Sequence, residues 1–167
     1  MIGYDFGILL QALLDAGVEF VVVGGVSATL NGVPVTTFDL DVVHRRSPEN
    51  IDLLIPVLEA LDAVYRIQPE RRLRPARSAL LSSGHQNLLT KYGPLDMLGT
   101  IGNDLGYEEL ESRSTEILIA EGVRVRILDL EMLIEVKEQL NGEKDRAMLP
   151  ILRRTLEERR HRHMDEG

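Results

Sequence analysis

Two aspartates, Asp39 and Asp41, lie one residue apart in the apolar stretch "TFDLDVV". Residues two apart in a strand point to the same face, so both carboxylates are expected to project side by side. Neighbouring carboxylates in a mostly buried strand repel each other and lose hydration. A divalent cation removes both costs, and Mg²⁺ binds one or two carboxylates together with water and substrate phosphates. The alternative is an exposed strand end, where the aspartates only bind water or cap a turn.

A glycine pair, Gly24-Gly25, lies between the apolar run "FVVV" and the short segment "VSATLNG". Glycine lets the backbone approach a ligand closely, and a helix that follows offers free N–H groups to a phosphate. Ser27, in the first turn of that helix, is expected to add a hydroxyl donor. A tight strand-to-helix turn would also use two glycines. Joined to the two aspartates, the pair predicts an anion site beside a cation site, as phosphoryl-group chemistry requires.

A third acid, Asp96, is the one acidic residue of the predicted strand in "GPLDMLGTI". If it lies beside Asp39 and Asp41, it would ligate a metal or take the proton of an attacking hydroxyl. If it lies near a turn, it would only be solvated. The residue by itself leaves both interpretations open.

Two lysines in the C-terminal part of the sequence are candidates for contact with an anionic ligand. Lys137 falls on the inward stripe of a predicted helix, which is formed by Leu130, Leu133, Ile134 and Leu140. A lysine there either extends to solvent or points into an anionic site, and next to a polyphosphate we favour the contact. Lys144 and Asp145 follow a helix stop at Gly142. They are either a second charged contact or an ordinary pair at a helix N-terminus.

Periodicity and turn residues predict the elements that position these side chains. Helices are expected over 4–17, 26–32, 47–63, 130–142 and 149–161, and 107–114 is a short helix or a loop. Strands are expected over 19–25 and 37–45, as a pair around Tyr92-Gly93, and as a hairpin over 115–129. We therefore predict an α/β (α+β) fold, a mixed β-sheet flanked by helices with further helices at the C-terminus.

The 167 residues fit one domain, with a core over about 1–128 and a helical segment over 129–163. No cysteine is present, which excludes disulfides and thiolate metal sites. The sequence has no signal-peptide pattern and no apolar run of about 18–20 residues, so a cytoplasmic protein without a membrane segment is expected.

Net charge restricts the binding partners that the sequence predicts. A formal charge of −8 argues against a general nucleic-acid binder. The stretch "RIQPERRLRPAR" (66–77) is nevertheless locally basic. It is either a solvated loop or a contact for substrate phosphates or an RNA acceptor.

The spacing of the first two motifs resembles a known signature. "VGG" (23–25), thirteen residues and "DLDV" (39–42) resemble the pattern of the DNA polymerase β-like nucleotidyltransferases. The string "GGVSATLNGVPVTTFDLD" is similar to small bacterial members, including abortive-infection toxins, at Ala28, Gly32, Thr37, Asp39 and Asp41. The later segment "LDLEMLIEVKEQLNGEKDRAMLPILRRTLEE" resembles the family's terminal helices.

The resemblance implies roles for the candidate residues. Asp39 and Asp41 would bind one or two Mg²⁺ ions that carry a nucleoside triphosphate (NTP), and Asp96 would be the third carboxylate, which ligates or activates the acceptor. The residues that it adds as nucleotide contacts are Gly24, Gly25, Ser27, Thr37, Lys137 and Lys144. Many members have arginine where this chain has Val35 and serine where it has Gly25. The γ-phosphate contact is then left to the backbone or to Ser27.

The implied activity is Mg²⁺-dependent transfer of a nucleotidyl group from an NTP to an acceptor hydroxyl, with release of pyrophosphate. The acceptor is a protein, an RNA such as tRNA, or a small molecule, and the chain would act as the toxin of a toxin–antitoxin pair with an antitoxin partner. The alternative is a catalytically silent nucleotide-binding module, or a toxin–antitoxin component that acts by binding.

Overall fold

The computed structural model describes residues 5–166 and contains a seven-stranded sheet of order β3-β4-β5-β2-β1-β7-β6. Its strands are β1 Phe20–Val23, β2 Leu40–His44, β3 Val64–Tyr65, β4 His85–Thr90, β5 Gly93–Leu98, β6 Ser114–Ala120 and β7 Val123–Leu128. The β2–β5 and β1–β7 pairs are parallel, and the other pairs are antiparallel. The predicted mixed sheet is thus confirmed.

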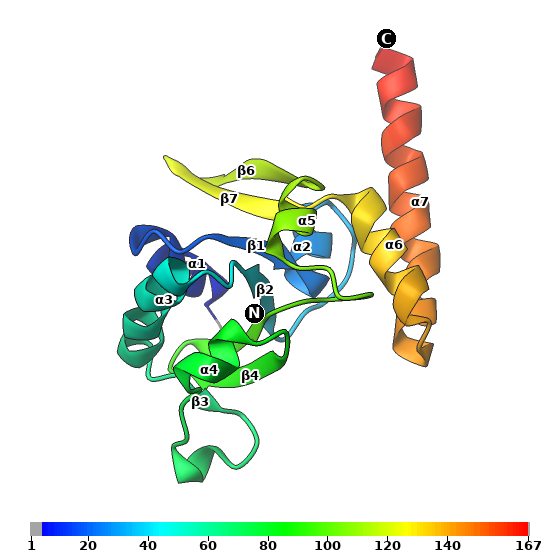
Figure 1. The fold of residues 1–167 in the computed structure, drawn as a ribbon. Coiled ribbons are helices and arrows are strands. Elements are labelled where there is room, and N and C mark those ends of the chain that lie inside the picture. The colour runs from blue at the N-terminus through cyan, green and yellow to red at the C-terminus, as the bar shows by residue number, and fades with distance from the viewer. Residues whose placement is uncertain (1–4, 167) are drawn as a thin grey trace.

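Helices cover both faces of the sheet (Figure 1). They are α1 Phe6–Asp15, α2 Gly24–Leu30, α3 Pro48–Ala60, the 3₁₀ turn η1 Pro69–Arg71, α4 Arg77–Leu81, α5 Tyr107–Glu111, α6 Leu130–Leu140 and α7 Glu143–Glu166. One core cluster joins the sheet to α1 and α3, and a second joins it to α5, α6 and α7. The two clusters lie on opposite faces of the sheet, because successive strand residues alternate between faces. Val42 belongs to the first cluster and Val43 to the second.

Local signals explain where several helices begin. The Asp5 carboxylate accepts the backbone N–H of Ile8 at the start of α1. The Ser47 hydroxyl accepts the N–H of Asn50 at the start of α3, as predicted, with Pro48 in the first turn. Tyr4, where the first predicted helix started, lies outside the described residues.

Three of the boundaries that differ from the prediction change where the site and the last helix begin. α2 begins at Gly24 rather than at 26, and β2 begins at Leu40, so Asp39 lies just before the strand. α7 extends over 143–166 instead of 149–161, with Pro150 inside it. Pro150 is exposed, so the carbonyl that loses its helical N–H partner can bond water, and the helix continues.

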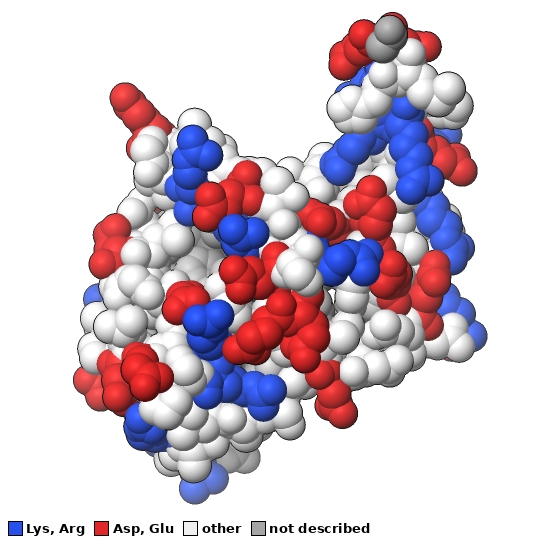
Figure 2. Space-filling model, turned by 45° about the horizontal axis from the view of Figure 1, so that its top comes forward, with Lys and Arg blue, Asp and Glu red and all other residues white. Residues whose placement is uncertain are grey.

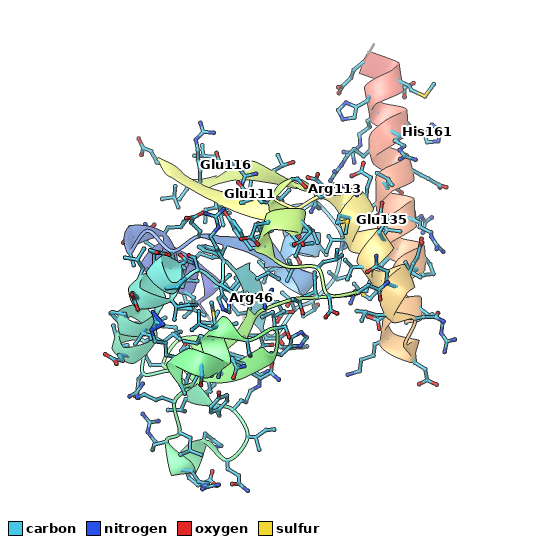
Figure 3. All side chains as sticks on the ribbon, in the orientation of Figure 1. Arg46, Glu111, Arg113, Glu116, Glu135 and His161 are labelled. Carbon is cyan, nitrogen blue, oxygen red and sulfur yellow. The ribbon has the colours of Figure 1, made fainter. Side chains whose placement is uncertain are left out.

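α7 contains 24 residues and projects beyond the body of the protein (Figure 1). It is mostly charged, and no helix among residues 5–166 combines the length and apolar character of a membrane span. Figure 2 shows acidic and basic side chains interspersed over one face, with basic residues along the projecting end. Arg113 and Glu135, labelled in Figure 3, form an ion pair of 2.9 Å that ties the start of β6 to α6.

Candidate active site

Strand register aligns four residues in one row across the centre of the sheet. Val23 pairs with Asp41, Asp41 with Asp96, and Asp96 with Asn87. Paired residues on neighbouring strands share a face, and this row lies on the side covered by α6. The row therefore places Val23, the residue before the glycine pair, beside two of the predicted acids, Asp41 and Asp96.

The three predicted acids converge. Asp39, Asp41 and Asp96 each offer a carboxylate oxygen, and these oxygens lie within 4.8 Å of one another. Asp39 reaches the cluster because it lies two residues before Asp41, and the Thr37 hydroxyl donates to its carbonyl at 3.0 Å. The spacing and the hard oxygen donors fit Mg²⁺.

The electrostatics of the cluster also fit a cation. Burial, followed by the hydrogen bond to Asp96 and the charge of Asp39, raises the pKa of Asp41 to about 8. Burial and the neighbouring Asp96 raise the pKa of Asp39 as well. The nearby cations Arg66 and Lys137 therefore do not offset burial and carboxylate repulsion, and a divalent ion would add positive charge.

An arginine that the sequence did not assign to the site contacts the third acid. Arg66 donates from Nη2 to Oδ1 of Asp96 at 2.9 Å and from Nη1 to the carbonyl of Leu88 at 3.0 Å. It follows β3, at the start of the basic stretch, and no signal in the sequence distinguished it from the arginines after it. Three of those later arginines form ion pairs elsewhere: Arg72 and Arg74 with Asp62, and Arg77 with Asp52.

The glycine pair is required by close packing. Gly24 has φ +64°, and a Cβ there would lie 2.3 Å from Oδ2 of Asp41. A Cβ on Gly25 would lie 2.6 Å from Oγ1 of Thr37. Any side chain at these positions would therefore displace Asp41 or Thr37.

The prediction that Ser27 faces a phosphate is corrected by the structure. Its side chain is fully buried, and its hydroxyl donates to the carbonyl of Leu128 at 3.1 Å. The reason is that α2 packs against β7, with Ser27 on the packed side of the helix. The hydroxyl thus belongs to the core.

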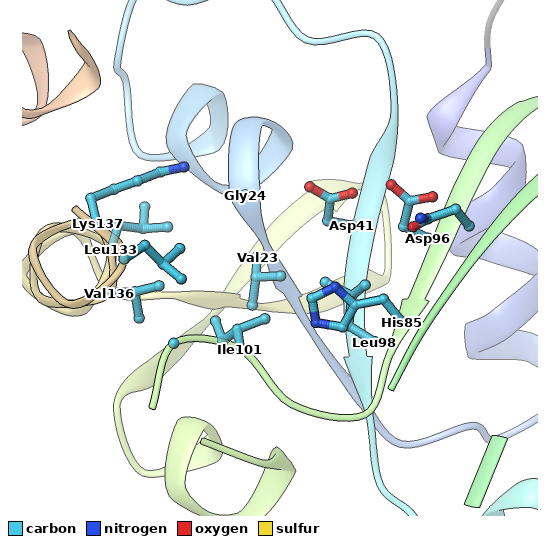
Figure 4. A pocket seen from close by; sticks show the side chains of 13 residues that line it. Val23, Gly24, Asp41, His85, Asp96, Leu98, Ile101, Leu133, Val136 and Lys137 are labelled. Atoms are coloured by element: carbon cyan, nitrogen blue, oxygen red, sulfur yellow. The ribbon is translucent and has the colours of Figure 1, made fainter. Parts of the chain in front are cut away.

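A cavity of about 240 Å³ adjoins the acids (Figure 4). It is lined by Val23, Gly24, Asp41, His85, Asn87, Asp96, Leu98, Ile101, Gly102, Leu133, Val136, Lys137 and Leu140. Apolar side chains of α6 form one wall, and the carboxylates lie on the opposite side. The cavity therefore combines an apolar surface with a charged one, as nucleotide pockets do.

Lys137 lines this cavity, as expected if it contacts an anionic ligand. Its Nζ lies 3.1 Å from Oδ1 of Asp145, and Oδ2 of the same carboxylate accepts the backbone N–H of Gly142. Asp145 is thus an acid at the start of α7 and a partner of Lys137. Lys144 is exposed and does not line the cavity, and Leu140, predicted on the inward stripe, is half exposed.

Two further cavity residues, His85 and Asn87, come from β4. Neither residue was among the predicted site residues, and the histidine has no partner at metal spacing in the sequence. The signal that could have found both residues is alternation: they lie two apart on the strand beside the one that carries Asp96. The sequence alone does not show which strands are neighbours.

The mixed seven-stranded sheet, flanked by helices and followed by C-terminal helices, is a nucleotidyltransferase-like fold. A crystal structure of a presumed nucleotidyltransferase from Thermotoga maritima is similar to this chain with a TM-score of 0.57. The similarity covers 92% of this chain and 91% of that chain at 18% sequence identity. No protein-family model matches the chain, and no curated protein is significantly similar to it in sequence.

Proposed function

We propose that the protein is a Mg²⁺-dependent nucleotidyltransferase, which transfers a nucleotidyl group from an NTP to an acceptor hydroxyl and releases pyrophosphate. The observation that carries this proposal is the convergence of Asp39, Asp41 and Asp96, with oxygens within 4.8 Å, beside a cavity lined by Lys137. Similarity to the Thermotoga maritima protein supports the fold on which the site is built.

The three acids would hold one or two Mg²⁺ ions. The bound metal would neutralise charge that develops during transfer and align the reacting groups. The carboxylates suit this role because they are close together, and because burial and the neighbouring acids raise the pKa of Asp41. The raised pKa of Asp41 means that binding of a cation displaces a proton from this group at neutral pH.

Other residues of the chain would bind and orient the triphosphate. Gly24 and Gly25 keep side chains away from Asp41 and Thr37, so that phosphates can approach the backbone. The Lys137 ammonium would contact phosphate oxygens, with Asp145 holding it in place. The apolar wall of α6 would exclude water from one side of the nucleotide.

The acceptor is a hydroxyl of a protein, an RNA or a small molecule. Within the basic stretch 66–77, Arg72, Arg74 and Arg77 form ion pairs with acids of the same protein. An RNA acceptor would have to compete for these arginines. The presence of three convergent acids favours turnover over a silent binding module, because binding of a nucleotide does not require a third carboxylate.

The test is label transfer. Purified protein is incubated with Mg²⁺, each of the four α-³²P-labelled NTPs and cell lysate, and the labelled molecule is identified. Asp39→Asn and Asp41→Asn are each expected to reduce labelling at least about 100-fold, as expected for loss of charge stabilisation. Asp52→Asn, at an exposed acid paired with Arg77, is the matched control and should label normally.

Two outcomes would contradict the proposal. Equal labelling by wild type and Asp41→Asn would remove the acids from the reaction. Calorimetric binding of an NTP with Mg²⁺, without label in any acceptor, would favour the silent binding module instead.

A further inference from the structure

The imidazole of His85, an exposed residue that lines the cavity, is held in a defined tautomer. Its Nε2 lies 2.8 Å from the backbone carbonyl oxygen of Thr100. A carbonyl oxygen only accepts hydrogen bonds, so Nε2 must carry the hydrogen. In the neutral ring, Nδ1 is then an unprotonated acceptor.

The position of His85 relative to the acids follows from the strand register. His85 pairs with Leu98, and Asn87 pairs with Asp96, so His85 is the diagonal neighbour of Asp96 on the same face. Diagonal neighbours in a sheet are about 7–8 Å apart, which leaves room for one reacting group between the side chains. Figure 4 shows the ring beside Leu98, on the Ile101 side of the cavity that it lines together with Asp41 and Asp96.

The other groups at this cavity are poor proton acceptors during transfer. Asp96 already accepts a hydrogen bond from Arg66 and, with Asp39 and Asp41, would ligate Mg²⁺. Cations beside a carboxylate lower its proton affinity. Lys137 is a cation, which leaves His85 as the base among the described residues that line the cavity.

His85 is not needed to hold the loop after β5. Oγ1 of Thr100 donates to the carbonyl of Ser83 at 3.0 Å, and the N–H of Gly99 donates to the carbonyl of Gly84 at 2.9 Å. The contact between His85 and Thr100 is therefore one of several between these segments. Its specific consequence is the orientation of the ring.

We propose that His85 is a catalytic residue, whose Nδ1 accepts the proton of the attacking acceptor hydroxyl; this rests on the function proposed above. The hydroxyl oxygen forms a bond to the α-phosphorus as its proton moves to Nδ1. The bond from the α-phosphorus to the bridging oxygen breaks, and pyrophosphate leaves with that electron pair. The imidazolium then returns its proton to water, which restores the tautomer held by Thr100.

A first experiment tests the tautomer without turnover. The ¹⁵N spectrum of metal-free protein labelled at its four histidines reports which ring nitrogen carries hydrogen, and His85→Gln identifies the His85 signals by their loss. We expect the neutral form of the ring to carry its hydrogen on Nε2. Hydrogen on Nδ1 of the neutral ring would overturn the proposal.

A second experiment measures the initial rate of label transfer into the lysate acceptor against pH, at saturating NTP and Mg²⁺. His85→Gln keeps a donor of similar reach for the Thr100 carbonyl but has no basic nitrogen. Its rate is expected to fall by about 10²–10⁴-fold, as for loss of a general base, with the KM for NTP changed less than about twofold. The pH profile of the variant should also differ in shape from that of the wild type, because residue 85 no longer has a basic nitrogen.

The control variant is Thr100→Val, which removes the hydrogen bond to Ser83 but leaves the Thr100 backbone carbonyl that binds His85. It should keep the shape of the wild-type pH profile. The other charged groups at the cavity, Asp41, Asp96 and Lys137, are common to all three proteins, so a difference between profiles belongs to residue 85. A His85→Gln variant as fast as wild type refutes the role of His85 alone, whereas a wild type that labels nothing refutes the proposed function and this role with it.

Discussion

The acid cluster and the basic stretch 66–77 shift the pKa values of nearby aspartates in opposite directions. In the cluster, Asp39, Asp41 and Asp96 lie together, Arg66 forms an ion pair with Asp96, and the pKa of Asp41 rises to about 8. In the stretch, hydrogen bonds from two arginines hold the pKa of Asp62 below its ordinary value. The stretch has more charged residues. The cluster, however, is where burial and repulsion between like charges are not offset by nearby cations.

This difference indicates which charges serve function. Ion pairs between exposed side chains are nearly neutral for stability, whereas buried like charges cost free energy unless something binds to them. A cluster of partly buried like charges, present despite this unfavourable free energy, is a candidate site for a ligand of opposite charge. The predictions that follow test whether the two regions differ in this way.

Among the variants that compare these two regions, the largest effect is expected from Gly24→Ala. The added methyl would lie 2.3 Å from Oδ2 of Asp41, so this carboxylate must move away from the other acids. A displacement of about 1 Å in a reacting site can reduce the rate about 100-fold, and a reduction of that size is expected in label transfer. Calorimetry should also show weaker Mg²⁺ binding.

Gly122→Ala is the matched control for this change. Gly122 also has a positive φ, +72°, but a Cβ there meets no atom within 4 Å. The backbone strain is therefore similar, about 1–2 kcal/mol, without a collision at the site. If both variants lost transfer equally, strain rather than displacement of Asp41 would be the cause.

The next effect concerns Arg66, which begins the basic stretch and forms an ion pair with Asp96 of the acid cluster. Arg66→Gln removes the charge beside Asp96, whose side chain is 8% exposed. We expect the free energy of unfolding to fall by about 1–3 kcal/mol without metal, because a buried acceptor loses its charged donor. Saturating Mg²⁺ should recover part of this loss, since the ion supplies positive charge to the same carboxylates. Denaturant titrations with and without Mg²⁺ measure both values, and an equal loss in the two conditions would contradict the expectation.

A smaller effect is the pH dependence of metal binding. With its pKa raised to about 8, Asp41 is mostly protonated at pH 7 in the metal-free protein and must lose this proton to bind Mg²⁺. Mg²⁺ affinity should therefore rise about fivefold from pH 7 to pH 8 and level off above it. The same shift means that the metal-free protein loses stability as pH rises from about 4 to 8.

Calorimetry in buffers of different ionisation enthalpy measures this proton release directly. The control is Asp41→Asn, which has no proton to lose and should bind Mg²⁺ weakly, without the rise in affinity. In the metal-free state, this variant should also unfold at a higher denaturant concentration than wild type at pH 8. A pH-independent wild-type affinity would show that Asp41 is already ionised at pH 7.

Most helices and strands of the fold could be predicted from the sequence, because the patterns that indicate them lie within short segments. Apolar alternation and the Tyr92-Gly93 turn predicted the β4–β5 hairpin, and the paired aspartates pointed to a shared face. Arg66 and His85 were not assigned to the site, since their roles depend on which strands are neighbours. The orientation of Ser27 depends on the packing of α2 against β7, which the spacing of residues within the helix does not encode.

The smallest effect is expected in the basic stretch itself. Arg77→Gln breaks an ion pair with Asp52 in which the two side chains are 42% and 64% exposed. Solvent screens such a pair, so the free energy of unfolding should change by less than about 1 kcal/mol, and Mg²⁺ should not alter the change. Denaturant titration beside Arg66→Gln makes the comparison direct, because both variants remove one guanidinium from the same stretch. If Arg77→Gln were as costly as Arg66→Gln, local pairing in the stretch would contribute to stability as much as the contact with the acids does, and the distinction between balanced and unbalanced charge would fail.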